Sequence, residues 1–309
     1  MGDITDAACD AARAQPPAMT KENNLFMQIA VHPDGTITRP EVPLIPPCSG
    51  GGAAVFSRDV PLDASLGTNL RLYLPNPAPP PPTKLPVVLF FHGGGFVLFS
   101  PATAFYHAHC EAMAAALPCL VASLDYRLAP ERRLPAAYDD AASALACSSG
   151  GNMAFFAGLR LVNSPSAAAV RGLLLHQPYL GGEERTPSEA ASGDDAMLPL
   201  EANDRLWSLA LPKGADRDHE FCNPTKTMSP AALAGLPRCL VTGNRGDPLI
   251  DRQREFARWL AEQGGVEVVA RMDHEGGHAA ELFVPESAHE LFDAMREFMS
   301  AIANDHASA

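Results

Sequence analysis

The stretch that decides the fold is Cys147-Ser148-Ser149-Gly150-Gly151-Asn152, which runs into a small, apolar segment at 153–159. With Ala146 two residues before Ser148 and Gly150 two residues after it, the pattern is A-x-S-x-G. This pattern is typical of a sharp strand-to-helix turn, in which the two backbones approach closely and the serine is exposed at the apex. Taken alone, the stretch also fits an ordinary Ser/Gly-rich turn, so the rest of the chain must decide between them.

A second signal lies upstream, where residues 87–91 read Val-Val-Leu-Phe-Phe and predict a central parallel strand covered on both faces. The run ends in His92-Gly93-Gly94-Gly95-Phe96. Three consecutive glycines cost backbone entropy unless the main chain must approach something closely. Such a loop can present N–H groups to a developing oxyanion. A phosphate-binding nest is the alternative, although no G-K-[ST] or G-x-G-x-x-G motif follows.

The remaining pattern alternates between strands and helices, which favours an α/β fold. We predict further strands at 54–60, 69–74, 119–126, 172–176, 238–243 and 266–272, and helices over 103–117 and from about Arg252. Residues 1–52 are polar and then Pro-rich, with little periodicity. We therefore expect two parts, an N-terminal arm or lid at 1–52 and a main domain at 53–309.

Three linked motifs resemble the hormone-sensitive-lipase branch of the α/β-hydrolases: H-G-G-G-F at 92–96, D-Y-R-L-A-P-E at 125–131 and S-x-G-G-N at 148–152. Within that branch the chain is most similar, from about Ala53 to its end, to plant carboxylesterases, whose relatives include the non-catalytic gibberellin receptors. The resemblance implies an α/β-hydrolase fold: a central, mostly parallel sheet flanked by helices, with the N-terminal arm over the active site. It also implies a serine carboxylester hydrolase that acts on a small-molecule ester and needs no cofactor or metal.

The same resemblance assigns the catalytic residues in the chain order Ser, Asp, His. Ser148 is the expected nucleophile, Asp247 in the motif D-P-L-x-D the orienting acid, and His278 the base. Asp251 is the second aspartate of that motif and is a candidate helix cap. His274 rivals His278, because Gly277 stands where the family usually has an aromatic residue.

We expect the backbone N–H groups of Gly93, Gly94 and Ser149 to form the oxyanion hole, helped by the positive end of the helix that begins under Ser148. Phe96 and Phe99 are expected to line the acyl side, with the arm over the mouth of the site. Two other readings stay open on the same fold: a gibberellin-type receptor that binds without turnover, and a dehydratase. The receptors have lost the base histidine, whereas His278 is present here.

The connection before Ser148 is unusually short. Ser148 comes 23 residues after Asp125, and the loop at 126–135 leaves only the 12 residues 136–147. A parallel crossover with its helix takes at least about 10–12 residues, and a strand needs roughly 5 more. The sequence therefore predicts an internal deletion that leaves either the helix or the strand absent or stunted, with a loss of stability or activity.

Composition limits the partners and the compartment. The formal net charge of −13 argues against nucleic acid and against an anionic membrane surface as partners. No apolar run of 18 residues predicts a membrane span, and the acidic opening, Met1 to Asp6, does not predict a signal peptide. The seven cysteines lack C-x-x-C spacing, so we expect reduced thiols in the cytoplasm and no zinc site. The oligomeric state is left open.

Overall fold

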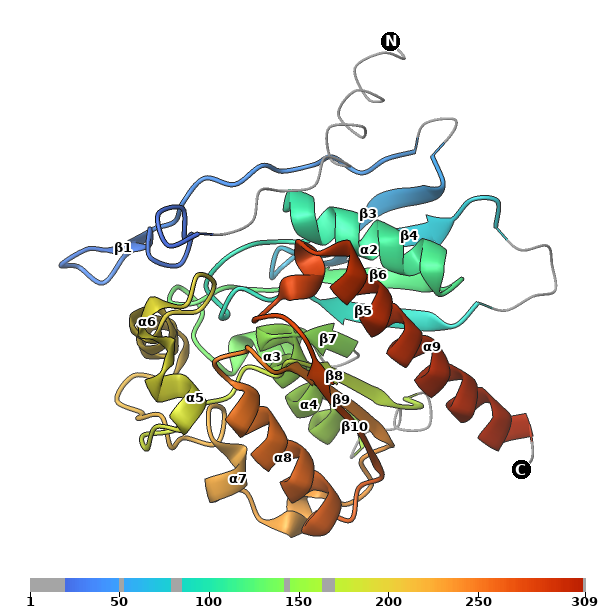
Figure 1. The fold of residues 1–309 in the computed structure, drawn as a ribbon. Coiled ribbons are helices and arrows are strands. Elements are labelled where there is room, and N and C mark those ends of the chain that lie inside the picture. Colours follow the sequence, from blue (N-terminus) through green and yellow to red (C-terminus); the bar gives the residue numbers. More distant parts are fainter. Residues whose placement is uncertain (1–19, 50–52, 79–84, 142–144, 163–169, 308–309) are drawn as a thin grey trace.

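The structure is a computed structural model that describes residues 20–49, 53–78, 85–141, 145–162 and 170–307. Its centre is an eight-stranded sheet in the order β10-β9-β8-β7-β5-β6-β4-β3 (Figure 1). The strands are β3 (Val55–Asp63), β4 (Thr68–Pro75), β5 (Val87–Phe91), β6 (Leu120–Asp125), β7 (Leu145–Cys147), β8 (Leu173–His176), β9 (Cys239–Asn244) and β10 (Val268–His274).

Six of these strands run parallel, from β10 at one edge to β6. The β3–β4 hairpin joins the other edge antiparallel to β6. Strands β8 and β9 are short and buried throughout, as expected for strands covered on both faces, and β5 is apolar and mostly buried after the exposed Val87 at its start. The mostly parallel sheet with helices between its strands confirms the predicted α/β class.

Helices cover both faces of the sheet (Figure 1). The helices α2 (Ala104–Ala116) and α9 (Pro285–Ala307) contact each other, through the rings of His109 and Phe292 and a hydrogen bond from Arg296 to Ala116 O. The other face carries α3 (Ala136–Asp140), α4 (Ser149–Leu161) and α8 (Ile250–Glu262). The remaining helical elements lie in the connections between strands: α5 (Pro187–Ala190), η2 (Ser192–Asp194), α6 (Leu200–Ala210), α7 (Pro224–Thr227), η3 (Pro230–Leu233) and η4 (Ala280–Leu282).

The described part of the arm, residues 20–49, lies against the main domain and contains the small hairpin β1 (Ala30–Val31) and β2 (Ile37–Thr38). Asn24 fixes its first turn: its side-chain oxygen accepts from the N–H groups of Phe26 and Met27, and its amide donates to Ala196 O and Met197 O. Arg39 pairs with Glu131 and donates to two backbone carbonyls of the main domain. The arm is thus tied down by polar contacts as well as by apolar packing.

The shortened crossover has the form that its length predicts. Helix α3 is only 5 residues long and β7 only 3, with 142–144 outside the described residues. Strand β7 still enters the central slot, because Leu145 and Ala146 pair with Phe90 and Phe91 of β5, and Cys147 pairs with His176 of β8. The prediction of a stunted element is confirmed, and both the helix and the strand are stunted.

The cysteines differ at one position from the prediction that all of them are reduced. Four cysteines are free and buried, namely Cys110, Cys119, Cys222 and Cys239. Cys48, in contrast, is disulfide-bonded, so the prediction of reduced thiols throughout was wrong for this residue. Cys9 and the side chain of Cys147 lie outside the described part of the chain. No described helix has the length and apolar character needed to cross a bilayer.

Candidate active site

Ser148 lies at the apex of the turn between β7 and α4. Its backbone has φ 54° and ψ −121°, in the left-handed half of φ space, which a non-glycine residue occupies only when its surroundings hold it there. The surroundings do so: Ser148 N–H donates to His176 O at 2.9 Å, and Ser148 O accepts from the N–H groups of Tyr179 and Asn152. A strained, well-braced backbone of this kind turns the hydroxyl away from both the strand and the helix.

A chain of short hydrogen bonds joins the three residues expected to be catalytic. Ser148 Oγ lies 2.8 Å from His278 Nε2, and His278 Nδ1 lies 2.9 Å from Asp247 Oδ2. All three side chains are at least nine-tenths buried. Asp247 also accepts from Leu249 N–H at 2.9 Å and from Gln253 Nε2 at 2.8 Å. Asp247 Oδ2 can accept from Nδ1–H of His278, and in that tautomer Nε2 is free to accept from the serine hydroxyl.

The charge balance around the imidazole favours its protonated form. Burial by itself lowers the pKa of His278. The charge and hydrogen bond of Asp247, with smaller contributions from Glu281 and Asp195, outweigh burial and raise that pKa above its ordinary value of 6.5. An imidazole of raised pKa is a stronger base when it is neutral, which suits proton transfer from a hydroxyl group.

The glycine loop after β5 lies directly beside the serine. A Cβ atom placed on Gly93 would be 3.0 Å from Ser148 Cβ, and one on Gly94 would be 2.3 Å from Leu98 O. Gly94 has φ +114°, so space and backbone conformation both require glycine there. The loop thus brings main-chain atoms against the nucleophile, as an oxyanion hole needs. Ser149, the other expected donor, is the first residue of α4 and is fully buried.

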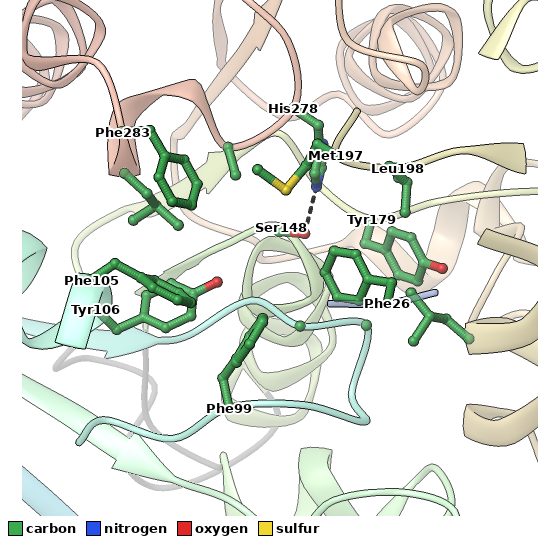
Figure 2. Close-up of a pocket in the computed structure, with 15 residues that line it drawn as sticks. Phe26, Phe99, Phe105, Tyr106, Ser148, Tyr179, Met197, Leu198, His278 and Phe283 are labelled. Atoms are coloured by element: carbon green, nitrogen blue, oxygen red, sulfur yellow. Dashed lines mark hydrogen bonds between the residues drawn. The ribbon is translucent and has the colours of Figure 1, made fainter. Parts of the chain in front are cut away.

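An apolar pocket of about 420 Å³, counting the space open to solvent, lies over Ser148 and His278. Figure 2 shows aromatic rings on both sides of the Ser148–His278 hydrogen bond, with Phe105, Tyr106 and Phe283 on one side and Phe26 and Tyr179 on the other. The remaining lining is also mostly apolar: Gly94, Gly95, Phe99, Met197, Leu198, Leu206, Ala279 and Leu282.

The two predicted lining residues have different positions. Phe99 lines the pocket, and its ring centroid lies 5.9 Å from that of Phe26 of the arm. Phe96 is not among the residues that line it. The Phe96 ring is 1% exposed and packs against Tyr138, Tyr179 and Trp207, so it supports the pocket wall from behind.

Asp251 and His274, the alternative candidates for the acid and the base, contact other residues. Asp251 lies in the first turn of α8 without capping it, and accepts from Ser188 N–H of α5 at 2.9 Å. His274 is the last residue of β10 and is partly exposed. Its Nδ1 lies 2.9 Å from Glu290 Oε2 of α9. Among the described side chains, only His278 makes the hydrogen bond to Ser148.

The sequence did not predict the residues that hold the backbone on either side of His278. Gln177 is fully buried, and its amide reaches both neighbours of His278: Oε1 accepts from Ala279 N–H at 2.7 Å, and Nε2 donates to Gly277 O at 3.2 Å. Asn244 also donates to Gly277 O, at 2.9 Å. A polar residue directly after the buried strand 172–176 was the available signal, since strand ends in parallel sheets position site residues.

Comparisons with known proteins agree with the fold and with the geometry of the site. A family model described as alpha/beta hydrolase fold matches residues 88–147 and 146–282, so the chain belongs to the α/β-hydrolase family. The two matched pieces meet at 146–147, where the crossover is short. Solved structures with this fold include a Pyrobaculum calidifontis esterase, with 24% identity and TM-score 0.66 over 82% of this chain and 85% of that one. EstE1, a thermostable carboxylesterase from a metagenomic library, has 25% identity and TM-score 0.66 over 80% and 89%.

Sequence relatives narrow the class to the plant carboxylesterases, to which this chain belongs. Probable carboxylesterase 8 of Arabidopsis thaliana is 36% identical over 94% of this chain and 97% of its own length. That alignment spans 327 positions, which is more than the 309 residues of this chain. The alignment therefore contains gaps within this chain. A 3-O-acetylpapaveroxine carboxylesterase of Papaver somniferum, CXE2, is 39% identical over 79% of this chain and 90% of its own. The predicted membership and enzyme class, a carboxylesterase of the serine hydrolases, are confirmed.

Proposed function

We propose that this protein hydrolyses a carboxylic ester of a small molecule through acylation of Ser148. The observation that carries the proposal is the hydrogen-bonded chain from Ser148 Oγ through His278 to Asp247, on a serine held at positive φ beside the glycine loop. Ester hydrolysis is also the chemistry named for the plant relatives.

In the acylation half, Ser148 Oγ attacks the acyl carbon while His278 Nε2 takes the hydroxyl proton. Asp247 holds the imidazole in orientation and stabilises its positive charge. The N–H groups of Gly93, Gly94 and Ser149 stabilise the oxyanion of the tetrahedral intermediate. His278 returns the proton to the leaving alkoxide, so that the alcohol departs and the acyl group stays on Ser148.

Deacylation repeats these steps with water. His278 takes a proton from water, the resulting oxygen attacks the acyl carbon, and the proton then returns to Ser148 Oγ as the carboxylic acid is released. The apolar lining of the pocket favours uncharged acyl and alcohol groups of modest size. Phe26 supports a role for the arm as a lid, since it places one aromatic wall over this pocket.

The shortened crossover is expected to lower the stability of this site, because Ser148 follows a strand of only three residues. A serine displaced by about 1 Å is expected to lose about 100-fold in rate. The intact contact between Ser148 and His278 disfavours the receptor alternative, and nothing in the part of the chain that the structure describes favours the dehydratase. The four free cysteines support a reducing, cytoplasmic compartment, whereas the disulfide at Cys48 argues against one.

The test is turnover of p-nitrophenyl butyrate by the wild-type chain and by Ser148→Ala. The proposal expects ester-dependent release of nitrophenol that falls at least about 1,000-fold in Ser148→Ala. Equal rates for the two proteins would refute it.

A further inference from the structure

A second buried histidine–carboxylate contact lies behind the triad. His176 is the last residue of β8, and its Nε2 lies 3.0 Å from Oε2 of Glu281 in η4. The two side chains are 10% and 1% exposed. These atoms are not aligned as a hydrogen bond, so the attraction between them is electrostatic. A lone pair on Nε2 would repel a carboxylate oxygen at this distance, so the contact requires a proton on Nε2 of His176.

Thr242 fixes the ring of His176 from its other side. Nδ1 of His176 lies 2.5 Å from Thr242 Oγ1, and these two residues are partners in the pairing of β8 with β9. The threonine hydroxyl can donate to Nδ1 of a neutral ring or accept from Nδ1–H of a charged ring. Both protonation states are therefore compatible with a proton on Nε2, on the side of Glu281.

The contact between His176 and Glu281 joins the two loops of the site. The backbone carbonyl of His176 accepts from Ser148 N–H at 2.9 Å, at the turn that carries the nucleophile. Glu281 comes shortly after His278 in the chain, in the turn that follows the base. An attraction between His176 and Glu281 therefore holds the segment of the base against the strand that braces the nucleophile.

Glu281 faces away from the pocket over Ser148. Several residues of the segment that carries the base line that pocket, namely His278, Ala279, Leu282 and Phe283. Glu281 is not among them, and its side chain lines a smaller pocket together with His176 and Thr242. Since the carboxylate lies outside the substrate pocket, its charge can act on the base without changing how the ester binds.

Three carboxylates of the described chain act on the imidazole of His278. Asp247 follows β9 and contacts Nδ1, Asp195 lies between η2 and α6, and Glu281 lies on the segment of the base itself. Burial lowers the pKa of His278, and these carboxylates raise it, with Asp247 contributing most and Glu281 next. Glu281 is thus close enough for its negative charge to act on the imidazole.

Two further histidines lie near Glu281. His109 of α2 interacts with its charge, but burial lowers the pKa of His109 to about 4, so this ring is neutral at pH 7. His274, at the end of β10, lines the same small pocket and pairs with Glu290 of α9. Among the described histidines, His176 is the one within ion-pair distance of Glu281.

We propose that Glu281, held in place by His176, is a positioning residue that stabilises the imidazolium form of His278 during the reaction. The proton still passes from Ser148 Oγ to His278 Nε2 and then to the leaving alkoxide, and Glu281 neither takes nor gives one. This role rests on the proposed ester hydrolysis, but the protonation of His278 can be measured without turnover. Glu281 should therefore affect the protonation of His278 and leave KM unchanged.

The test is an NMR titration of His278 in the full-length chain with ¹⁵N-labelled histidine, in the parent protein and in Glu281→Gln. The substitution keeps the size of the side chain and removes its charge, so the imidazolium loses part of its stabilisation. We expect the midpoint of the His278 titration to fall by at least about 0.3 pH unit, which is about a twofold change in basicity. The pH profile of kcat/KM should move in the same direction, with KM for p-nitrophenyl butyrate nearly unchanged.

Glu290→Gln is the matched control, because it removes a carboxylate that pairs with His274 at the surface. Solvent screens that charge, so the His278 midpoint should move by less than about 0.1 pH unit. His176→Gln keeps an N–H donor near Glu281 and should preserve the effect of Glu281→Gln. His176→Leu removes the donor and should reduce that effect by at least about half.

Three results would overturn the proposal: an unmoved His278 midpoint in Glu281→Gln, an equal shift in Glu290→Gln, or an undiminished shift in the His176→Leu background. Should Glu281→Gln or His176→Leu not fold, the ¹⁵N shifts of His176 in the parent protein decide. A proton on Nε2 supports the contact with Glu281, and an unprotonated Nε2 refutes it.

The proposed function and the role of Glu281 fail separately. A lowered midpoint without any ester turnover would refute hydrolysis alone. Ordinary turnover with an unmoved midpoint would refute only the role of Glu281.

Discussion

The backbone N–H of Ser148 donates to the carbonyl of His176 at 2.9 Å, although the strand that carries Ser148 into the sheet is only three residues long. The turn is therefore held from the β8 side as well as through its own strand. Tyr179 N–H reinforces this by donating to Ser148 O. These bonds explain how the turn keeps its geometry although α3 and β7 are short.

Alanine substitutions should show which of the two candidate histidines, His278 or His274, is the catalytic base. His278→Ala removes the only described side-chain partner of Ser148 Oγ, so kcat/KM for p-nitrophenyl butyrate should fall at least about 1,000-fold with little change in melting temperature. His274→Ala is the matched control. It loses a contact with Glu290 at the surface and should keep activity within about threefold. The opposite ranking of the two variants would mean that the base is misassigned.

Activity should depend on the neutral form of His278. Because its pKa is raised above 6.5, kcat/KM should rise with pH and reach half its maximum above pH 6.5. The same shift stabilises the fold fully below pH 6.5, and this contribution is lost as pH rises through the raised pKa.

The variant Asp247→Asn tests why the pKa of His278 is raised. It removes the carboxylate charge, which is the largest of the contributions that raise this pKa against the effect of burial. The midpoint of the pH profile should move down, and kcat should drop about 1,000- to 10,000-fold. A wild-type midpoint below pH 6.5, or an unmoved midpoint in Asp247→Asn, would contradict this reading of the pair.

Gln177 should act by positioning the histidine. Gln177→Leu loses both hydrogen bonds to the residues flanking His278, and we expect kcat to fall about 10- to 100-fold with KM nearly unchanged. Gln177→Glu retains an acceptor for Ala279 N–H, so it should recover part of the rate. Steady-state kinetics of both variants decide the point. A change confined to KM, or no recovery in Gln177→Glu, would assign Gln177 to another role.

The short crossover should limit stability. Replacing 142–144 by the complete crossover segment of a full-length relative should raise the melting temperature by about 5–15 °C, since it restores several large core side chains. A Gly/Ser segment of equal length is the control and should give no gain. A wild-type chain that already melts above about 60 °C in calorimetry, with ordinary esterase turnover, would show that the argument from chain length is wrong.

The sequence was most informative where chemistry restricts the choice of residue. The run at 87–91 coincides with β5, which is mostly buried after the exposed Val87, because a strand covered on both faces tends to be continuously apolar. The turn at Ser148 and the D-P-L-x-D loop were recognisable for a similar reason, since small residues and chain order are fixed by backbone geometry. Counting residues before Ser148 also predicted the stunted crossover.

Other features depend on tertiary packing and left little trace in the sequence. Phe96 follows the glycine loop as a pocket residue would, but its positive φ turns the ring into the core toward Trp207. Gln177 acts through two backbone groups 100 and 102 positions away, which no local pattern encodes.

The most direct test of the central claim is covalent labelling by a fluorophosphonate, followed by peptide mass spectrometry. The account predicts one phosphonate per chain, attached to Ser148, with labelling abolished in Ser148→Ala and greatly slowed in His278→Ala. Labelling that persists in Ser148→Ala, on Ser149 or elsewhere, would show that Ser148 is not the nucleophile.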